Sequence, residues 1–219
     1  MAIKRFCGTL RVLGSGLRIG ASEETAGLGE VDGPILRHPV TRVPYVPGSS
    51  VKGKIRCLLE QQSPEYKPLD EGGPCSCGKC TVCQLFGCGS TANTVTPSRL
   101  VFRDCQPTEH TMSVWDRAGV DSEIRTHVSI SRTTGAARKG ALAVMERIPA
   151  GSDFNFSFSL RTFEGDDVPK YYKVLAEGFE LLSKHYLGGS GSRGYGEVLI
   201  VNEDGTPMHE HLRKLAEAG

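Results

Sequence analysis

The residues best suited to chemistry are the cysteines of the run Cys75-Ser-Cys77-Gly-Lys-Cys80-Thr-Val-Cys83, which Cys88 follows. Five of the eight cysteines lie here, and in a reducing compartment such crowding favours metal binding over disulfides. Overlapping C-x-x-C pairs allow thiolates from one tight turn to bind the same tetrahedral zinc ion. We predict a structural Zn²⁺ site formed by the first four of these cysteines, in which Cys88 or a histidine could replace one ligand. An iron–sulfur cluster and unligated thiols are the alternatives.

A second candidate is the stretch VPGSSVKGKI, residues 46–55, whose pattern is close to a phosphate-binding P-loop. Gly48, Gly53 and Lys54 fit the form G-x-x-x-x-G-K, but Ile55 stands where a Ser or Thr must hold Mg²⁺. Two prolines in the preceding VPYVP argue against the buried central strand that a P-loop follows. The pattern therefore disfavours a nucleotide hydrolase.

The same stretch still predicts a helix start that attracts anions. Ser49 or Ser50 would cap the helix, and its first turns contain Lys52, Lys54 and Arg56. The free N–H groups and the dipole of a helix N-terminus favour negative charge. The alternative is an ordinary capped helix with a solvated basic face.

A glycine loop, GGSGSRGYG, is the third candidate. Gly189, Gly191 and Gly194 match the dinucleotide fingerprint G-x-G-x-x-G, but they follow a predicted helix and precede a predicted strand. That order is the reverse of a Rossmann site, which is therefore excluded. The glycines allow close approach of a ligand, and Arg193 is suited to phosphate, unless the loop is a simple helix-to-strand connection.

Hydrophobic periodicity predicts the elements that position these residues. Phe154, Phe156, Phe158 and Leu160 alternate with polar residues, which indicates a half-buried strand. The polar segment 110–149 has too few apolar positions for a core and is predicted as a protruding, hairpin-like arm. The expected order is strand 3–13, loop 16–47, helix from 49 or 50, cysteine insertion 64–89, strand 99–104, arm, strand 154–160, helix 168–186, glycine loop, strand 197–201 and a short charged helix. This is an α+β plan, the ferredoxin-like β-α-β-β-α-β unit.

Composition excludes some classes of protein. The 26 Lys and Arg nearly balance the 25 Asp and Glu, so an anion site must come from local arrangement of charge. No apolar run is long enough to span a bilayer and no signal peptide is recognisable, so we expect a cytoplasmic protein with no membrane partner.

Five stretches together resemble a known family. They are TRVPYVPGSSVKGKIRCLLE, the cysteine run ending in CTVCQLFG, RLVFRD, SISRTTGAARKGALAVMERIPAG and GGSGSRGYGEV. In this order they are similar to the backbone subunit of type III CRISPR effector complexes, of the III-A kind, in the RAMP superfamily. The resemblance covers most of the chain, up to Val201.

The resemblance implies a single RRM-like domain over residues 1–219 with three insertions: a catalytic loop at 16–47, a cysteine-rich metal-binding segment at 64–97 and a thumb at 107–150. It implies a subunit that repeats in a filament along CRISPR RNA and cleaves target RNA at regular intervals in antiviral defence. The implied partners are CRISPR RNA, target RNA, other copies of the chain, and the large signature, small and capping RAMP subunits.

The resemblance also assigns roles to residues. The helix start and the glycine loop would hold guide phosphates, and the thumb would wedge between bases of the guide–target duplex. The implied RNA-binding residues are Arg37, Ser49, Ser50, Lys52, Lys54, Arg56, Arg125, Arg132, Gly189, Gly191, Arg193 and Gly194.

Asp32, in GEVDGPILR, is the implied catalytic residue, because it matches the family's Asp-Asn-Pro-x-x-Arg loop. It would hold Mg²⁺ or another divalent ion, or accept the proton of an attacking 2′-hydroxyl, while Arg37 or His38 offsets phosphate charge. From the residues alone Asp32 is a turn residue, since Asp-Gly is a common turn dipeptide.

The chain departs from the family pattern in two places. Gly33 and His38 replace the usual Asn and acidic residue of the cutting loop, and Ile130-Ser131-Arg132 replaces Ile-Asp-Arg in the thumb. Two other hypotheses therefore stay open: a guide-binding scaffold without cleavage, and an endonuclease that processes CRISPR repeat RNA.

Overall fold

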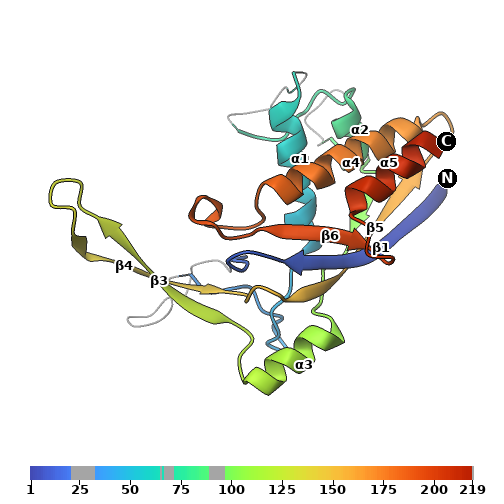
Figure 1. Ribbon diagram of the computed structural model, residues 1–219. Helices are drawn as coiled ribbons and strands as arrows, with labels where there is room; N and C mark the ends of the chain where they lie inside the picture. The colour runs from blue at the N-terminus through green and yellow to red at the C-terminus, as the bar shows by residue number, and fades with distance from the viewer. Residues whose placement is uncertain (21–32, 65, 67–71, 89–96, 219) are drawn as a thin grey trace.

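The computed structural model describes residues 1–20, 33–64, 66, 72–88 and 97–218. Four antiparallel strands form a sheet in the order β2-β5-β1-β6, and helices α1, α4 and α5 cover one of its faces (Figure 1). The α+β class with antiparallel pairing is thus confirmed. The elements are β1 Ala2–Val12, α1 Gly48–Gln62, β2 Leu100–Phe102, β5 Asp153–Thr162, α4 Val168–Lys184, β6 Val198–Asn202 and α5 Met208–Ala218.

The core is built on the strand that the sequence predicted most clearly, β5. Its phenylalanines and Leu160 are almost fully buried, while the residues between them face the other side of the sheet. In the β1–β5 register Phe158 lies opposite Phe6, and their rings stack at 4.7 Å between centroids. Phe102 of β2 stacks on Phe158 at 5.3 Å, which joins three strands in one aromatic cluster.

A second, two-stranded sheet projects away from this core (Figure 1). It is the β3–β4 hairpin, formed by β3 Glu123–Ile130 and β4 Ala137–Arg147. The prediction of a hairpin-like arm is right for these strands but misses α3 Glu109–Ala118 before them. Trp115 of α3 is buried against Phe154. Only Thr111 and Trp115 are buried in α3, and two buried residues are too few to produce a helical periodicity in the sequence. The cysteine insertion also contains a short helix, α2 Thr81–Phe86, which was not predicted.

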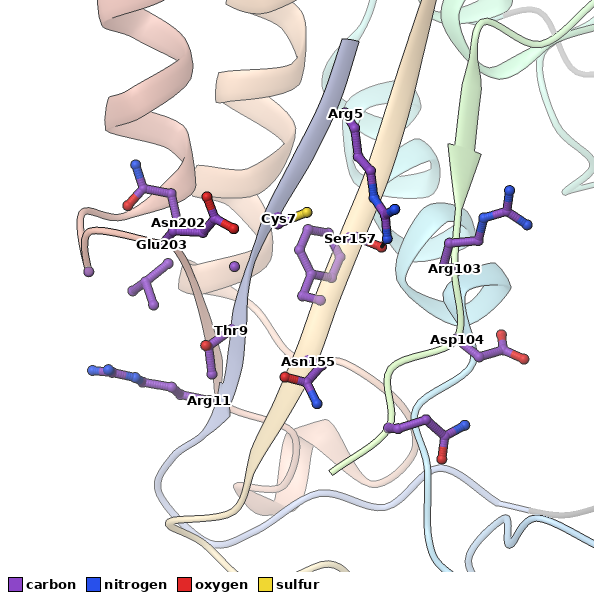
Figure 2. A pocket seen from close by; sticks show the side chains of 15 residues that line it. Arg5, Cys7, Thr9, Arg11, Arg103, Asp104, Asn155, Ser157, Asn202 and Glu203 are labelled. Carbon is purple, nitrogen blue, oxygen red and sulfur yellow. Dashed lines mark hydrogen bonds between the residues drawn. The ribbon is translucent and has the colours of Figure 1, made fainter. Parts of the chain in front are cut away.

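The face of the sheet opposite the helices is polar. A hollow of about 910 Å³ on this face is lined by side chains that include Arg5, Thr9, Asn155 and Ser157 (Figure 2). Phe156, the aromatic residue among the lining residues, is only 2% exposed. The hollow therefore has no exposed ring on which an RNA base could stack. In the described ranges no helix combines the length and apolar character needed to cross a membrane.

The aromatic cluster gives a prediction about stability. Phe158→Ala removes a fully buried ring that contacts three strands, so we expect the free energy of unfolding to fall by about 3–5 kcal/mol. Phe163→Ala is a matched control, because this ring is 41% exposed and a loss of about 1 kcal/mol is expected. Urea unfolding of the full chain measures both. Equal losses would contradict the central place of Phe158.

Candidate nucleic-acid interface and metal centre

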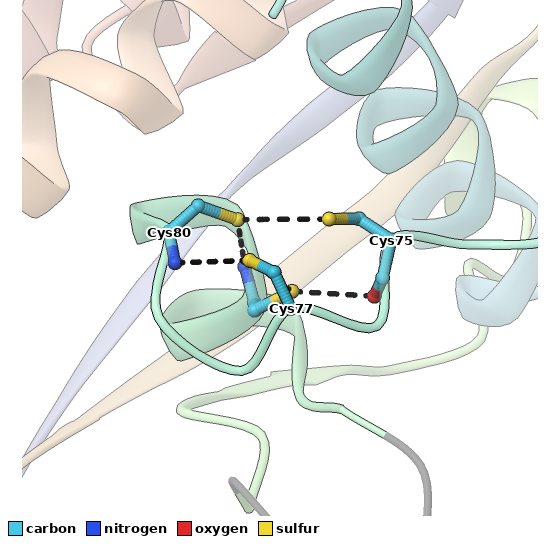
Figure 3. Close-up of side chains that lie close together, drawn as sticks. Cys75, Cys77 and Cys80 are labelled. Atoms are coloured by element: carbon cyan, nitrogen blue, oxygen red, sulfur yellow. Dashed lines mark hydrogen bonds between the residues drawn. The ribbon is translucent and has the colours of Figure 1, made fainter. Parts of the chain in front are cut away.

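The four cysteines predicted as ligands come together. The Sγ atoms of Cys75, Cys77, Cys80 and Cys83 all lie within 4.8 Å of one another, with Cys75–Cys80 at 4.0 Å and Cys77–Cys83 at 3.8 Å (Figure 3). Sulfurs of a tetrahedral zinc site with Zn–S bonds of 2.3 Å are about 3.8 Å apart, so this set fits a metal ion. Cys88 is buried beside the cluster but is not one of the four.

The cluster already favours one thiolate. Burial opposes ionisation of Cys77, but the backbone N–H groups of Cys80 and Lys79 outweigh it and lower the pKa of Cys77 to about 6. Burial raises the pKa of Cys80 to about 11. All eight cysteines are free thiols in this structure.

Hydrogen bonds hold the cysteine cluster against helix α1. The backbone N–H of Cys75 donates to Glu60 Oε1 at 3.0 Å, and its carbonyl accepts from Arg56 Nη2 at 3.0 Å. Arg56 and Glu60 form an ion pair at 2.7 Å with each other. Arg56 was expected to bind RNA, but its guanidinium contacts these protein groups, so it positions the cysteine segment on α1.

The start of α1 differs from the prediction in its cap. The helix begins at Gly48, Pro47 is the N-cap residue without a side-chain cap, and Ser49 and Ser50 lie in the first turn. Asp104 from the end of β2 supplies the acceptor instead, since its Oδ1 accepts the Gly48 N–H at 2.9 Å. The carboxylate of Asp104 thus takes the place that an anion would occupy at the first N–H group.

The two lysines of α1, Lys52 and Lys54, have different surroundings. Lys52 Nζ donates to Ser98 Oγ at 2.7 Å and to the Leu100 carbonyl at 3.0 Å, and burial lowers its pKa. It therefore ties α1 to β2 and is not a freely exposed cation. Lys54 Nζ lies over the Tyr186 ring at 4.0 Å from the centroid. Tyr186 precedes the glycine loop, so Lys54 brings the helix start and that loop to one surface.

The glycine loop packs on the segment of residues 16–20. Gly189 N–H donates to the Arg18 carbonyl at 2.8 Å, while Gly191 and Gly194 bound the 3-10 turn that contains exposed Arg193. Next in the loop is Tyr195, which is buried and whose hydroxyl lies 2.7 Å from His127 Nε2 on β3. The loop is thereby joined to the base of the β3–β4 hairpin.

Asp32, the catalytic candidate, lies outside the described residues, but the chain that follows it is well defined. The Gly33 carbonyl accepts from the Glu146 N–H on β4 at 3.1 Å, and Ile35 N–H donates to Glu146 Oε2 at 2.9 Å. Arg37 then donates to both oxygens of Asp121 at 2.6 and 2.8 Å and to Glu146 Oε1 at 2.7 Å. Residues 33–37 are therefore fixed to the hairpin base.

These contacts change the expected roles of Arg37 and His38. The hydrogen bond with Asp121 raises the pKa of Arg37, whose charge is matched by two carboxylates. His38 Nδ1 accepts from the N–H groups of Val40 and Thr41 at 3.3 and 3.2 Å, which caps a turn. Both side chains have partners within the protein, and a role for either in offsetting phosphate charge stays a prediction.

The hairpin has two different faces. Ile124, Val128 and Leu142 are more than half exposed on one face, where Val128 pairs across the strands with Leu142. The other face contains His127 and the Glu123–Arg147 ion pair at 2.7 Å. Arg125 lies near Glu123 at 3.7 Å, and Arg132 is exposed beyond the end of β3.

Several residues of this region were missed by the sequence analysis: Arg18, Asp121, Glu146 and Tyr195. Asp121 and Glu146 carried no local signal, because their partner Arg37 is 84 and 109 residues away. Arg18 and Tyr195 each lie between glycines, in GLRIG and RGYGE, and that flanking is the signal that marks close packing of backbone.

Comparisons with known proteins agree with this architecture. The sequence model of the RAMP superfamily matches residues 9–198. A protein of Methanothermobacter thermautotrophicus named CRISPR system Cms endoribonuclease Csm3 is 37% identical over 203 residues, which cover 86% of this chain and 80% of that protein. The protein of the same name from Mycobacterium tuberculosis is 35% identical over 213 residues, 89% of this chain and 85% of the relative.

Solved structures show the same fold. The crystal structure of Methanopyrus kandleri Csm3 has a TM-score of 0.63 and 23% identity, covering 91% of this chain and 75% of that one. A Csm3–Csm4 subcomplex of the type III-A CRISPR-Cas interference complex has a TM-score of 0.61 and 23% identity, covering 99% and 95%.

The Arg37 cluster gives a prediction that depends on pH. Arg37 lowers the pKa of Asp121; burial would raise that of Glu146, but hydrogen bonds from Ser122 and Arg37 lower it. Arg37→Met leaves these carboxylates unpaired, so we expect the free energy of unfolding at pH 7 to fall by about 1–3 kcal/mol.

A carboxyl whose pKa is lower in the folded state contributes its full stability above the unfolded pKa and loses it as pH falls through the folded pKa. The deficit should therefore shrink as pH falls below about 4. Urea unfolding between pH 7 and pH 3 measures it. Arg117→Met is the control, since Arg117 bonds only to a carbonyl of its own helix among the described residues. A deficit that is constant with pH would show that the ion pairs do not account for it.

Proposed function

The chain belongs to the RAMP superfamily, as a Csm3-type member, and from this we propose that it is the repeating backbone subunit of a type III CRISPR effector complex. In that role it binds CRISPR RNA and cleaves complementary target RNA at regular intervals, in antiviral defence. The observation that supports this most is the alignment of 86–89% of the chain with relatives named as endoribonucleases. Its partners are further copies of itself, the capping RAMP subunits, and the large and small subunits.

We assign the core to the ferredoxin-like, RRM-like class. The connectivity β1-α1-β2-β5-α4-β6 with strand order β2-β5-β1-β6 supports this assignment. Residues 1–219 are then one domain, into which the loop 16–47, the metal-binding segment 64–97 and the thumb 107–150 are inserted. The thumb consists of α3 and the β3–β4 hairpin.

Guide phosphates contact the surface shared by the start of α1 and the glycine loop. Ser49, Lys54 and Arg193 reach this surface, and Lys54 already contacts Tyr186 beside the loop. Ser50, Gly189, Gly191 and Gly194 complete it through backbone and small side chains. Lys52 and Arg56 act indirectly, by holding α1 against β2 and the cysteine segment.

The thumb separates bases of the guide–target duplex. Its exposed Ile124, Val128 and Leu142 suit a wedge, since apolar side chains inserted between base steps unstack them. Arg125 and Arg132 then meet the phosphates on either side. A base turned out in this way leaves its ribose free to adopt in-line geometry.

Cleavage takes place beside Asp32. The 2′-hydroxyl oxygen bonds to phosphorus while the bond to the 5′-oxygen breaks, which leaves a cyclic phosphate, and the leaving oxygen takes up a proton. A divalent ion, Mg²⁺ in the first instance, supplies Lewis-acid stabilisation of the phosphate when bound. Asp32 holds that ion or accepts the hydroxyl proton, and residues 33–37, which follow it in the sequence, are anchored to β4.

Loss of Asp32 tests the assignment of the cut. In the complex reconstituted with a guide, its partner subunits and Mg²⁺, we expect a ladder of evenly spaced products from a labelled target RNA. Asp32→Ala should slow cleavage at least about 100-fold, because a group acting on the reacting atoms is lost, while target affinity is retained.

Glu217→Ala, which removes an exposed carboxylate from α5, is the matched control and should cleave as the native complex does. If native and Asp32→Ala complexes cleave alike, another residue or subunit cuts the RNA. If neither cleaves but both bind target, the chain is a guide-binding scaffold.

The four-cysteine cluster is proposed to hold one structural Zn²⁺. Its donors and spacing match a closed tetrahedral site, and its backbone contacts with Arg56 and Glu60 transmit that order to α1.

We expect about one zinc per chain by elemental analysis, and Cys83→Ser should lose most of it and lower the melting temperature. Cys57→Ser is the matched control, since Cys57 is an exposed thiol of α1 outside the cluster. Retention of full zinc by Cys83→Ser would place the metal on another ligand set, with Cys88 the next candidate.

A further inference from the structure

Arg18 occupies a space formed by glycines from separate segments. A Cβ atom on Gly33 would overlap its Nη2, and one on Gly189 would lie 2.8 Å from its Nη1. Met145 Sδ lies at the same point of β4, 2.7 Å from the position of a Gly33 Cβ. The guanidinium is therefore placed where the loop after Asp32, the glycine loop and the hairpin base meet.

Among the described residues, no acidic side chain matches the charge of Arg18. Its Nε is buried and has no hydrogen-bond partner, and no carboxylate of the described residues forms an ion pair with it. Arg37, Arg56 and Arg147, by contrast, each contact an acidic group at 2.7 Å or less. A buried donor without a partner costs about 1–3 kcal/mol, which an anionic ligand would offset.

The backbone around Arg18 is fixed on both sides. Leu17 and Ile148 exchange two hydrogen bonds at 3.0 and 2.8 Å, and the Arg18 carbonyl accepts from Gly189 N–H at 2.8 Å. The Ile19 carbonyl accepts from Leu36 N–H at 2.8 Å, which joins the segment to residues 33–37. The guanidinium is thus pre-positioned, and little reorganisation is needed when a ligand binds.

A phosphodiester is the ligand that fits this place. Guanidinium groups bind phosphate oxygens through two parallel N–H bonds, and bare glycine backbone leaves room for the sugar–phosphate chain. Arg18 lies against Gly33, and Gly33 directly follows in the sequence the residue assigned to the cut, Asp32.

We infer that Arg18 is a further catalytic residue, which binds the scissile phosphodiester of the target RNA and stabilises the negative charge that grows on its non-bridging oxygens. The inference rests on the proposed function. It gives this chain a protein cation at the cut, where Arg37 and His38 are held by other protein groups.

The test compares Arg18→Met and Arg18→Lys with Arg213→Met, which removes an exposed guanidinium from α5, in the reconstituted complex. Single-turnover cleavage is followed at saturating complex, and the affinity for guide and target RNA is measured over a range of salt. Arg18→Met should slow cleavage about 100-fold at every cut, as loss of one charge-stabilising donor does, with both affinities nearly unchanged. Arg18→Lys should recover part of the rate because it keeps the charge, and Arg213→Met should behave as native.

Each other outcome overturns the inference in a distinguishable way. An unchanged rate in Arg18→Met, in a native complex that cleaves, removes Arg18 from the reaction while the proposed function stands. Normal cleavage with weaker guide binding, and a salt slope reduced by about 0.7, moves Arg18 to a guide phosphate. If Arg18→Met and Arg18→Lys lose cleavage rate to the same extent and also lower the melting temperature to the same extent, Arg18 is a packing residue. A native complex that binds target without a ladder fails the proposed function and the inference together.

Discussion

The position of each functional element depends on the antiparallel register between β1 and β5. Ten residue pairs from Ala2–Thr162 to Arg11–Asp153 place the phenylalanines of β5 against the helices and its polar residues on the open face. A slip of one residue would exchange the two faces, so burial fixes the register strongly. At the end of this pairing Gly151 N–H bonds to the Val12 carbonyl, and Leu17 bonds to Ile148, which brings residues 16–20 to the base of the hairpin. The candidate cutting site is therefore set by the same aromatic core that stabilises the sheet.

The near-zero net charge is compatible with a phosphate-binding role because the acidic groups pair with some of the arginines and not with others. Acidic groups neutralise the arginines that have structural roles, such as Arg37 with Asp121 and Arg56 with Glu60. Arg18 and exposed Arg193 have no such ion pair among the described residues. Arg18 and Arg193 thus give the place where the glycine loop meets residues 16–20 two cations without an acidic partner among the described residues, and local arrangement rather than composition decides such fields.

Sequence reasoning succeeded where a signal is local and failed where the partner is remote. The alternation of β5 and the close spacing of the four clustered cysteines are short-range patterns, and the sequence predicts both features. The cap of α1 was assigned to serines, but Asp104, 56 residues away from Gly48, provides it. The sequence shows where the basic residues stand but not what they contact. It contains no signal that Lys52 bonds to the Leu100 carbonyl or that Arg37 pairs with Glu146. The sequence gives the position of each basic residue directly, whereas the group that it contacts is decided by the tertiary fold.

Gly33 illustrates how a departure from a family pattern can be read physically. The family pattern that the chain resembles has an asparagine after the aspartate of this loop, and Gly33 stands at that position here. In this structure a side chain at position 33 would overlap Arg18 Nη2 and approach Met145 Sδ, so the glycine is what allows the arginine to reach the loop. An asparagine offers an amide to the RNA, while an arginine offers a full charge with a fork of donors. If Arg18 binds the scissile phosphate, glycine in place of asparagine at position 33 exchanges one polar contact with the RNA for a stronger one from a different segment. Gly33 is then part of the cutting site, and its presence does not indicate that cleavage has been lost.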